Sequence, residues 1–295
     1  MKSLKGKVAL VAGGTRGAGR AISVSLAEAG AFVYVTGRSS REHGLYGTRK
    51  ETIEETADII TEKGGEGIAV RVDHSNEEEV ENLIRKIDQK QGRLDILIND
   101  IWGGESQIDW NLPYWKQDIS KGTRVFNNAV ITHIITAKHA TQLLLKNENG
   151  IILEITDGVG YHYRGNIFYS LTKISTNHLA LAYAEELKNT GITSIALTPG
   201  FLRSEEMLDN FGVKEENWRD AIKSHPHFAG SETPYYIGRC VVSLATDPQV
   251  KRFNGQALST WELSKIYDFR DIDGSKPDWE YFHRMYEEGK IDPET

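Results

Sequence analysis

The hydrophobic pattern alternates short, continuously apolar runs with longer stretches in which apolar residues recur at helical spacing. The runs predicted as strands are residues 8–12, 32–36, 67–72, 94–99, 151–156, 192–198 and 256–260. The stretches predicted as helices are residues 21–30, 51–63, 76–91, 168–189 and 235–246, and most of 116–146. Apolar strands between amphipathic helices are typical of a parallel sheet covered on both faces. We therefore predict an α/β, doubly wound fold that binds its ligand at the carboxyl ends of the strands.

Three stretches stand outside this alternation. Residues 39–50 form a long loop, and about 201–233 form a long segment that we interpret as a substrate lid, because loops of this length are often functional. Residues 278–288 have the pattern of an amphipathic helix. We predict one domain over 1–264 and a C-terminal extension, 265–295, that packs on this domain or on a neighbouring subunit.

A glycine-rich turn joins the first predicted strand to the first helix. Gly13, Gly17 and Gly19 have G-x3-G-x-G spacing. Glycine permits positive φ, close approach of the backbone to a phosphate, and tight packing of helix on strand. The helix N-terminus would present free N–H groups to a diphosphate. An ordinary tight turn is the alternative, but the strand–turn–helix context favours a Rossmann-type dinucleotide site.

The end of the second strand distinguishes the two nicotinamide cofactors. NAD sites usually place an acidic residue there, whereas this chain has Thr36-Gly37-Arg38, with Arg16 in the glycine turn. Guanidinium groups suit a 2′-phosphate, so we predict NADP(H), with NAD(H) less favoured. Two solvated arginines are the alternative. Asp73, after the third strand, either binds the adenine amine or caps the next helix.

Tyr169 and Lys173 stand four residues apart near the start of a predicted helix, and so share one helix face. A nearby ammonium favours the phenolate and lowers the pKa of a tyrosine. Such a tyrosine can exchange a proton with a carbonyl oxygen while hydride passes to or from the cofactor. The pair is informative here because it follows the fifth strand of a dinucleotide-binding sheet.

Together these motifs resemble the classical short-chain dehydrogenase/reductase (SDR) family over nearly the whole chain. The resemblance implies Tyr169 as acid/base, supported by Lys173 and Asn128. The cofactor-binding residues that it and the preceding arguments imply are Gly13, Thr15, Arg16, Gly17, Gly19, Arg38, Asp73, Asn99, Tyr169, Lys173, Pro199, Gly200, Leu202 and Ser204. Residues 36–38, 91–95, 262–267 and 270–274 are similar to a subgroup typified by dehydrogenase/reductase SDR family member 1, which implies an NADPH-preferring carbonyl reductase.

Two positions depart from the family pattern. Where the family has a catalytic serine, this chain has Thr156-Asp157. The usual spacing from the catalytic tyrosine, counted back from Tyr169, places Thr156 at the serine position. Alignment of the glycines that follow places Asp157 there instead. We prefer Thr156 and expect Asp157 to face the substrate. Trp102 replaces a glycine beside the expected nicotinamide site. Four tryptophans fall in segments that should border the cleft: Trp102, Trp110, Trp115 and Trp218. They suggest an aromatic wall for an apolar or planar substrate. The alternative is that they pack the loops around the cleft.

Composition excludes several other classes. The net charge of −7, without clusters of basic and aromatic residues, argues against nucleic-acid and membrane partners. The single cysteine, Cys240, and the lack of a long apolar run or signal-like start suggest a cytoplasmic protein. The spacing of the histidines predicts no metal site. By the family resemblance we expect a homodimer or homotetramer.

The favoured hypothesis is an NADP(H)-dependent oxidoreductase acting on the carbonyl or alcohol group of a small substrate. The alternative is a catalytically impaired NADP(H)-binding sensor or scaffold, which the altered serine and glycine positions would explain. Retention of both Tyr169 and Lys173 favours the enzyme, because a pure binding protein would need only the lysine.

Overall fold

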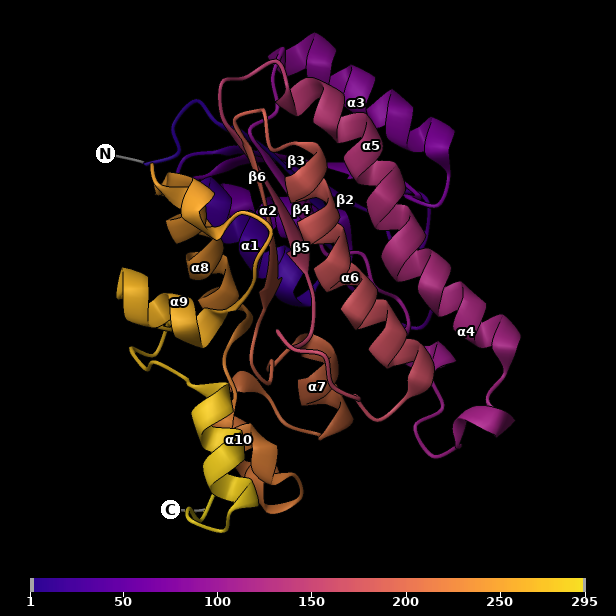
Figure 1. Ribbon diagram of the computed structural model, residues 1–295, viewed down its shortest axis with the longest axis vertical. Helices are drawn as coiled ribbons and strands as arrows, with labels where there is room; N and C mark the ends of the chain where they lie inside the picture. The colour runs from indigo at the N-terminus through magenta and orange to yellow at the C-terminus, as the bar shows by residue number, and fades with distance from the viewer. Residues whose placement is uncertain (1–2, 294–295) are drawn as a thin grey trace.

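The computed structural model describes residues 3–293, and its centre is a seven-stranded sheet in which all pairings are parallel (Figure 1). The strands are β1 (Val8–Ala12), β2 (Phe32–Gly37), β3 (Glu66–Arg71), β4 (Ile96–Asn99), β5 (Gly150–Ile155), β6 (Ile192–Thr198) and β7 (Ala257–Ser259). Their order, β3-β2-β1-β4-β5-β6-β7, reverses direction at β1 and β4. The predicted doubly wound fold is confirmed, with its switch point where the glycine turn leaves β1.

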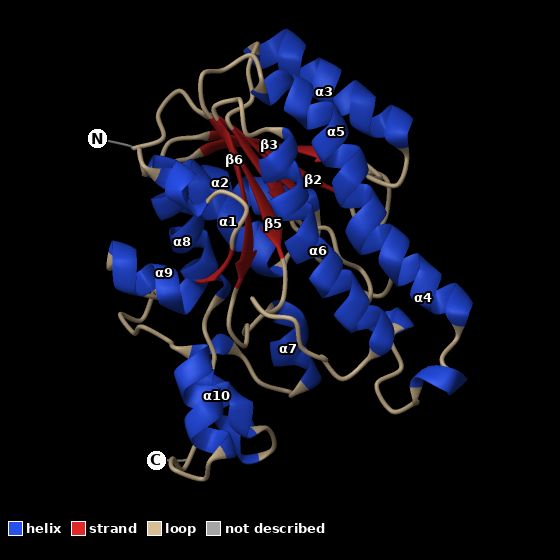
Figure 2. Ribbon diagram, viewed as in Figure 1, coloured by secondary structure: helices blue, strands red, loops and turns tan. Residues whose placement is uncertain are grey.

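Helices cover both faces of the sheet (Figure 2). One layer contains α1 (Gly17–Glu28), α2 (Ile53–Glu62), α8 (Pro234–Thr246) and α9 (Thr260–Tyr267), which share a hydrophobic cluster with the sheet. The other contains α3 (Glu77–Gln91), α5 (Thr132–Leu144) and α6 (Ile167–Glu186). Burial on both faces explains why the central strands are apolar along their whole length.

Helix boundaries follow local capping chemistry. The Asn76 side chain accepts hydrogen bonds from the N–H groups of Glu78 and Glu79, and so begins α3 as its sequence predicts. Gly92 ends α3 in a left-handed conformation, with φ of +66°. The stretch predicted as mostly helical over 116–146 consists of α4 (Ile119–Phe126), a π-helical turn (Asn127–Ile131) and α5. The π turn is the part that periodicity does not reveal.

The lid is compact and partly helical. It contains α7 (Glu205–Asn210) and two 3-10 segments, η4 (Glu215–Lys223) and η5 (Pro226–Gly230), around buried Trp218 and Phe228. Helix α10 (Trp279–Glu287) packs against η5, so the C-terminal extension lies on the lid of its own chain (Figure 1). The predicted boundary at 264/265 falls inside α9. Over residues 3–293, none of the helices is long and apolar enough to cross a membrane.

Candidate active site

A cleft of about 510 Å³ opens at the carboxyl ends of the strands, beside the switch point. The predicted residues that line it are Gly13, Thr15, Arg16, Gly17, Arg38, Asp73, Trp102, Asn128, Thr156, Asp157, Tyr169, Lys173, Pro199, Gly200, Leu202 and Ser204. The structure thus brings the glycine turn, the arginine after β2 and the Tyr–Lys pair into one cleft. Two predicted residues, Gly19 and Asn99, lie behind it.

The glycine turn has the geometry that its sequence requires. Gly13 has a φ of +94°, and the N–H groups of Gly13 and Gly14 donate to the Thr36 carbonyl at 3.0 and 2.9 Å. A Cβ on Gly19 would lie 2.3 Å from the Gly13 carbonyl oxygen. Gly19 is therefore needed for close packing of α1 under the turn, although it does not line the cleft.

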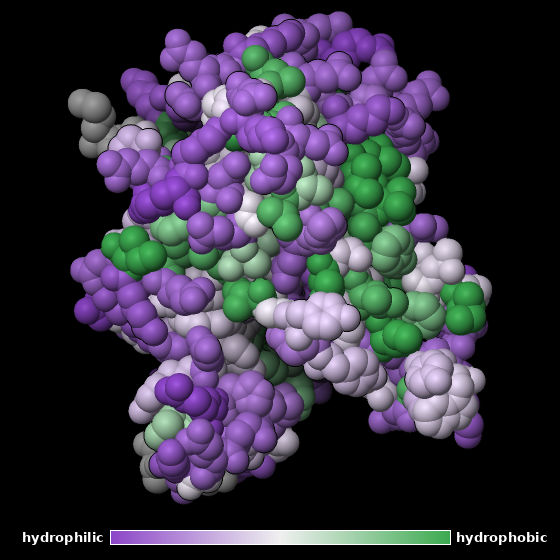
Figure 3. All heavy atoms as spheres, in the orientation of Figure 1, coloured by the Kyte–Doolittle hydropathy of each residue, from purple (hydrophilic) through white to green (hydrophobic). Residues whose placement is uncertain are grey.

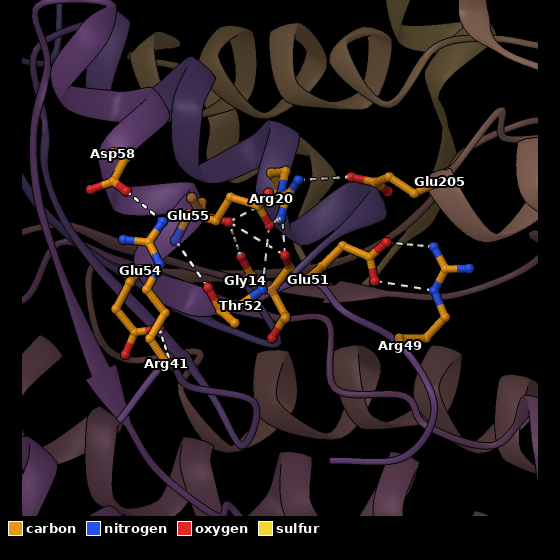
Figure 4. A network of polar contacts seen from close by, with 12 residues as sticks. Gly14, Arg20, Arg41, Arg49, Glu51, Thr52, Glu54, Glu55, Asp58 and Glu205 are labelled. Carbon is orange, nitrogen blue, oxygen red and sulfur yellow. Dashed lines mark hydrogen bonds and ion pairs between the residues drawn. The ribbon is translucent and has the colours of Figure 1, made fainter. Parts of the chain in front are cut away.

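The N-terminus of α1 holds a carboxylate. The Gly17 N–H donates to Glu205 Oε2 at 2.8 Å, and Glu205 also pairs with Arg20 at 3.3 Å (Figure 4). The next lid residue, Glu206, pairs with Arg16 at 3.7 Å. These contacts show that anionic oxygens are accommodated at the end of α1, where helix dipole and free N–H groups favour negative charge.

Arg38 lies at the other end of the cleft, and its guanidinium carbon is 3.4 Å from the centre of the Tyr46 ring. Tyr46, from the long loop after β2, was not predicted; an aromatic residue near an arginine-rich strand end is the only sequence signal for it. Arg41 instead turns towards α2 and pairs with Asp58 at 2.7 Å (Figure 4). Arg38 is thus the arginine after β2 that reaches the cleft.

Asp73 does not cap α3, because Asn76 does. Its carboxylate accepts from the backbone N–H and the hydroxyl of Ser75 at 3.0 and 2.7 Å. Burial raises the pKa of Asp73, but the Ser75 hydrogen bonds and the charge of Arg38 outweigh it and leave the pKa below its ordinary value. The side chain lines the cleft, so the adenine-binding alternative remains a prediction.

Asn99, expected to contact the cofactor, is fully buried and instead supports the cleft from behind. Its side-chain amide donates to Glu154 Oε1 at 2.7 Å, and Glu154 Oε2 lies 2.6 Å from His133 Nδ1. The other nitrogen of His133 is 3.0 Å from the Ile101 carbonyl oxygen. This network fixes the backbone just before Trp102. Sequence reasoning missed Glu154 and His133, although a glutamate within an apolar strand is an unusual residue.

Tyr169 and Lys173 project from the first turns of α6, which Asn166 begins by accepting hydrogen bonds from the N–H groups of Phe168 and Tyr169. The Tyr169 hydroxyl donates to Asp157 Oδ2 at 2.8 Å. The Thr156 hydroxyl donates instead to the Lys173 carbonyl at 3.0 Å. Asp157 therefore faces the tyrosine hydroxyl and Thr156 anchors α6, while both residues line the cleft.

Two of the four tryptophans flank Tyr169. The Trp102 and Trp110 rings meet it edge-on at 5.5 and 5.1 Å, and Lys173 Nζ lies 4.3 Å from the centre of the Trp102 ring. Trp115 is largely exposed, and Trp218 is buried in the lid. Two further aromatic residues, Phe201 and Trp279, line the cleft and complete its aromatic wall. Their rings stack with centres 5.7 Å apart. Trp279 comes from the C-terminal extension, whose docking place the sequence leaves open.

Buried Glu232 supports the Pro199-Gly200 turn at the cleft. Its Oε2 accepts from the Gly200 N–H and the Thr260 hydroxyl, both at 2.9 Å. Burial, reinforced by Asp271, raises its pKa to about 8, against the opposing effects of these hydrogen bonds and Arg203. The folded protein therefore keeps a proton that the unfolded chain, titrating near 4.5, releases.

This shift gives a signed prediction for stability. Its contribution is complete below pH 4.5 and is lost as pH rises towards about 8, because folding takes up a proton in this window. The slope reaches at most about 1.4 kcal/mol per pH unit. We expect Glu232→Gln to remove this pH dependence of stability. The urea midpoint of the variant, relative to that of the wild type, should therefore rise from about pH 5 to about pH 8. Parallel pH dependences for the two proteins would contradict the assignment.

Comparison with known proteins agrees with this geometry. The sequence model of the family described as short chain dehydrogenase matches residues 7–215. Dehydrogenase/reductase SDR family member 1 of Mus musculus is 33% identical over 288 residues, covering 96% of this chain and 88% of the relative; the Homo sapiens protein is 32% identical over 276 residues, covering 92% and 85%. A crystal structure of a short chain dehydrogenase from Mycobacterium thermoresistibile superposes with a TM-score of 0.78 at 20% identity, covering 94% and 92%.

Proposed function

Because the chain belongs to the short-chain dehydrogenase family of NAD(P)-dependent oxidoreductases, we propose that it uses NADP(H) to interconvert a carbonyl and an alcohol on a small substrate. One observation carries the proposal: Tyr169 and Lys173 lie in the same cleft as the glycine turn and Arg38. One dinucleotide bound along the cleft could then contact both the glycine turn and the acid/base residue Tyr169.

The cleft has the donors that a phosphorylated dinucleotide requires. The Gly17 N–H and Arg16 lie at the N-terminus of α1, where a diphosphate would replace the carboxylates of Glu205 and Glu206. Arg38 would contact a 2′-phosphate, and its contact with Tyr46 orients the guanidinium. Lys173 would hold the ribose next to the nicotinamide. When bound, the cofactor supplies or accepts the hydride.

Tyr169 is the proposed acid/base. Its hydroxyl would donate a proton to the carbonyl oxygen during reduction and accept one during oxidation. The Lys173 ammonium, 5.4 Å from the centre of the Tyr169 ring, favours the phenolate state. Asn128, in the π turn that lines the cleft, would hold a water for proton exchange. Asp157 accepts a hydrogen bond from the Tyr169 hydroxyl and would face the substrate oxygen.

The wall of Trp102, Phe201 and Trp279 favours an apolar or planar substrate, because aromatic side chains offer large apolar contact faces. The lid contributes Phe201, Leu202, Ser204 and Met207 to the cleft. We test the proposal by following NADPH oxidation with a panel of aldehydes, ketones and quinones. Turnover of a panel member supports it; NADPH binding without turnover of any member favours the alternative given below.

Asp157 provides a prediction specific to this chain. A serine hydroxyl can donate to an oxygen on which negative charge develops, whereas a carboxylate repels that charge. We expect Asp157→Ser to raise kcat/KM for carbonyl reduction about tenfold, the equivalent of one hydrogen bond worth roughly 1.4 kcal/mol. Thr156→Ser, which keeps the hydroxyl that binds the Lys173 carbonyl, is the matched control and should change the rate less than about twofold.

A fall in kcat/KM for Asp157→Ser, of the same size as that for Asp157→Ala, would contradict this reading. It would mean that the carboxyl group itself takes part in turnover. The two substitutions thus separate a carboxylate that hinders the reaction from one that assists it.

A second function is favoured by one observation. The Tyr169 hydroxyl already donates a hydrogen bond to Asp157, which would suit an NADP(H)-binding sensor or scaffold that has little catalytic activity. This alternative predicts tight binding of NADPH, no turnover, and equal affinity in Tyr169→Phe. We still favour the enzyme hypothesis, because both Tyr169 and Lys173 are present in the cleft that also contains the glycine turn and Arg38.

We also propose that the protein is a homodimer or homotetramer. Apolar side chains gather on the side formed by α4, α5 and α6 (Figure 3). The exposed apolar residues of these helices and the intervening π turn include Phe126, Ile131, Ile134, Leu171 and Leu181. A contiguous apolar surface on paired helices is typical of an interface between identical subunits.

A further inference from the structure

The junction between the lid and helix α10 gathers metal-ligating side chains from distant parts of the sequence. His227 lies in η5, and His283 and Glu287 lie four residues apart on α10. One ligand atom from each of these three residues lies within 4.8 Å of the others. His283 Nδ1 is 3.8 Å from Glu287 Oε1, and the His227 and His283 ring centres are 5.5 Å apart.

Within the described residues, Nε2 of His227 is buried and lacks a hydrogen bond. Its ring packs instead among aromatic rings, with Trp279 at 5.4 Å and Tyr286 at 5.7 Å. A buried ring nitrogen without a hydrogen bond is unfavourable, and a metal ion is one of the few partners that satisfies it.

We propose that His227, His283 and Glu287 form a Zn²⁺ site that joins the lid to the C-terminal extension. Two imidazoles and a carboxylate are a donor set that Zn²⁺ accepts, with water as the fourth ligand. Tetrahedral coordination needs ligand atoms about 3.4 Å apart. The side chains of His283 and Glu287 are 47% and 62% exposed, so rotation about their side-chain bonds can close the remaining distance.

The proposed site differs from the expectation that the histidines bind no metal. That expectation followed sequence spacing, and His227 and His283 are brought together only by the docking of α10 on η5. Bound Zn²⁺ would hold α10 against the lid and keep Trp279, which stacks on Phe201, in the wall of the cleft. The inference does not depend on the proposed function, because metal binding requires neither cofactor nor turnover.

The test uses the full-length protein, stripped with a chelator and titrated with ZnCl₂ against a chromophoric competitor. We expect one Zn²⁺ per chain, and affinity about 100-fold lower in His283→Ala and in Glu287→Gln. The matched controls are His43→Ala, an exposed histidine far along the chain, and Glu288→Gln, the neighbouring carboxylate, which pairs with Lys290. Both controls should bind as the wild type does.

Tryptic cleavage after Arg284, within α10, provides a readout of docking. Zn²⁺ should slow this cleavage in the wild type and leave it unchanged in His283→Ala. The His283 side chain is exposed, so its removal should not unfold the protein. A circular dichroism spectrum of the variant that matches the wild-type spectrum would show this. Absence of stoichiometric binding, or equal binding in His283→Ala and His43→Ala, would overturn the site. Zn²⁺ binding that does not slow cleavage would overturn its role in joining α10 to the lid.

Discussion

Tyr169→Phe is expected to lower kcat for carbonyl reduction about 10²–10⁴-fold while NADPH affinity changes less than about twofold. The hydroxyl is the group that we propose moves a proton to the substrate oxygen, and phenylalanine removes it while keeping the ring. The ring contacts with Trp102 and Trp110 are retained, so the wall of the cleft stays in place. Loss of general acid catalysis without loss of binding is therefore the expected signature.

The measurement is steady-state NADPH oxidation with the best substrate of the carbonyl panel, alongside direct binding of NADPH. Tyr163→Phe is the matched control, because Tyr163 lies in the same β5–α6 loop but its side chain is largely exposed. It should leave kcat unchanged. Equal activity of Tyr169→Phe and wild type would remove Tyr169 from the reaction and require another acid.

Arg38→Ala is expected to weaken NADPH binding about 10–100-fold and NADH binding less than about twofold. A hydrogen bond to a charged group contributes about 1.5–3 kcal/mol, and each 1.4 kcal/mol is about tenfold in affinity. Only NADPH carries the 2′-phosphate that we propose Arg38 contacts. The selective loss thus reports a phosphate contact, whereas a general collapse of the cleft would weaken both nucleotides.

Calorimetric titration of both nucleotides measures this selectivity. Arg41→Ala is the matched control: it removes an arginine from the same segment, but one that pairs with Asp58 on α2 and not with the cleft (Figure 4). It should bind both nucleotides as the wild type does. Equal weakening of NADPH by the two substitutions, or equal weakening of NADPH and NADH by Arg38→Ala, would contradict the assignment of Arg38.

The sheet could be predicted because its determinants are local. Apolar runs such as residues 192–198 form strands wherever they are buried on both faces, and Asn76 marks the start of α3 by its capping side chain. The turn after β1 was predictable for the same reason, since Gly13 and Gly19 meet steric demands made by neighbouring residues. The π turn at Asn127–Ile131 has no such local signature.

The parts of the site that were missed depend on contacts between distant segments. Glu205 reaches Gly17 across the cleft, and Trp279 enters the wall from the C-terminal extension. The support of Asn99 by Glu154 depends on the register of β4 beside β5, in which these two residues are partners. Sequence spacing along one segment cannot reveal these pairings.

The choice between Thr156 and Asp157 shows the same limit at close range. The two residues follow β5 directly, and successive side chains at a strand end point in opposite directions. Thr156 turns to the Lys173 carbonyl and Asp157 to the Tyr169 hydroxyl. A difference of one position along the chain decides which side chain meets the Tyr169 hydroxyl, and spacing along the chain does not reveal this.

The measurement that tests the central claim most directly is a fluorescence titration of the wild-type protein with NADPH and NADH. Trp102 lies in the cleft beside Lys173, so bound reduced nicotinamide should quench tryptophan emission and gain emission by energy transfer. We predict saturable binding of both nucleotides, tighter for NADPH. Binding of neither would contradict the account, because it would mean that Trp102 and the lid carboxylates close the cleft to a dinucleotide.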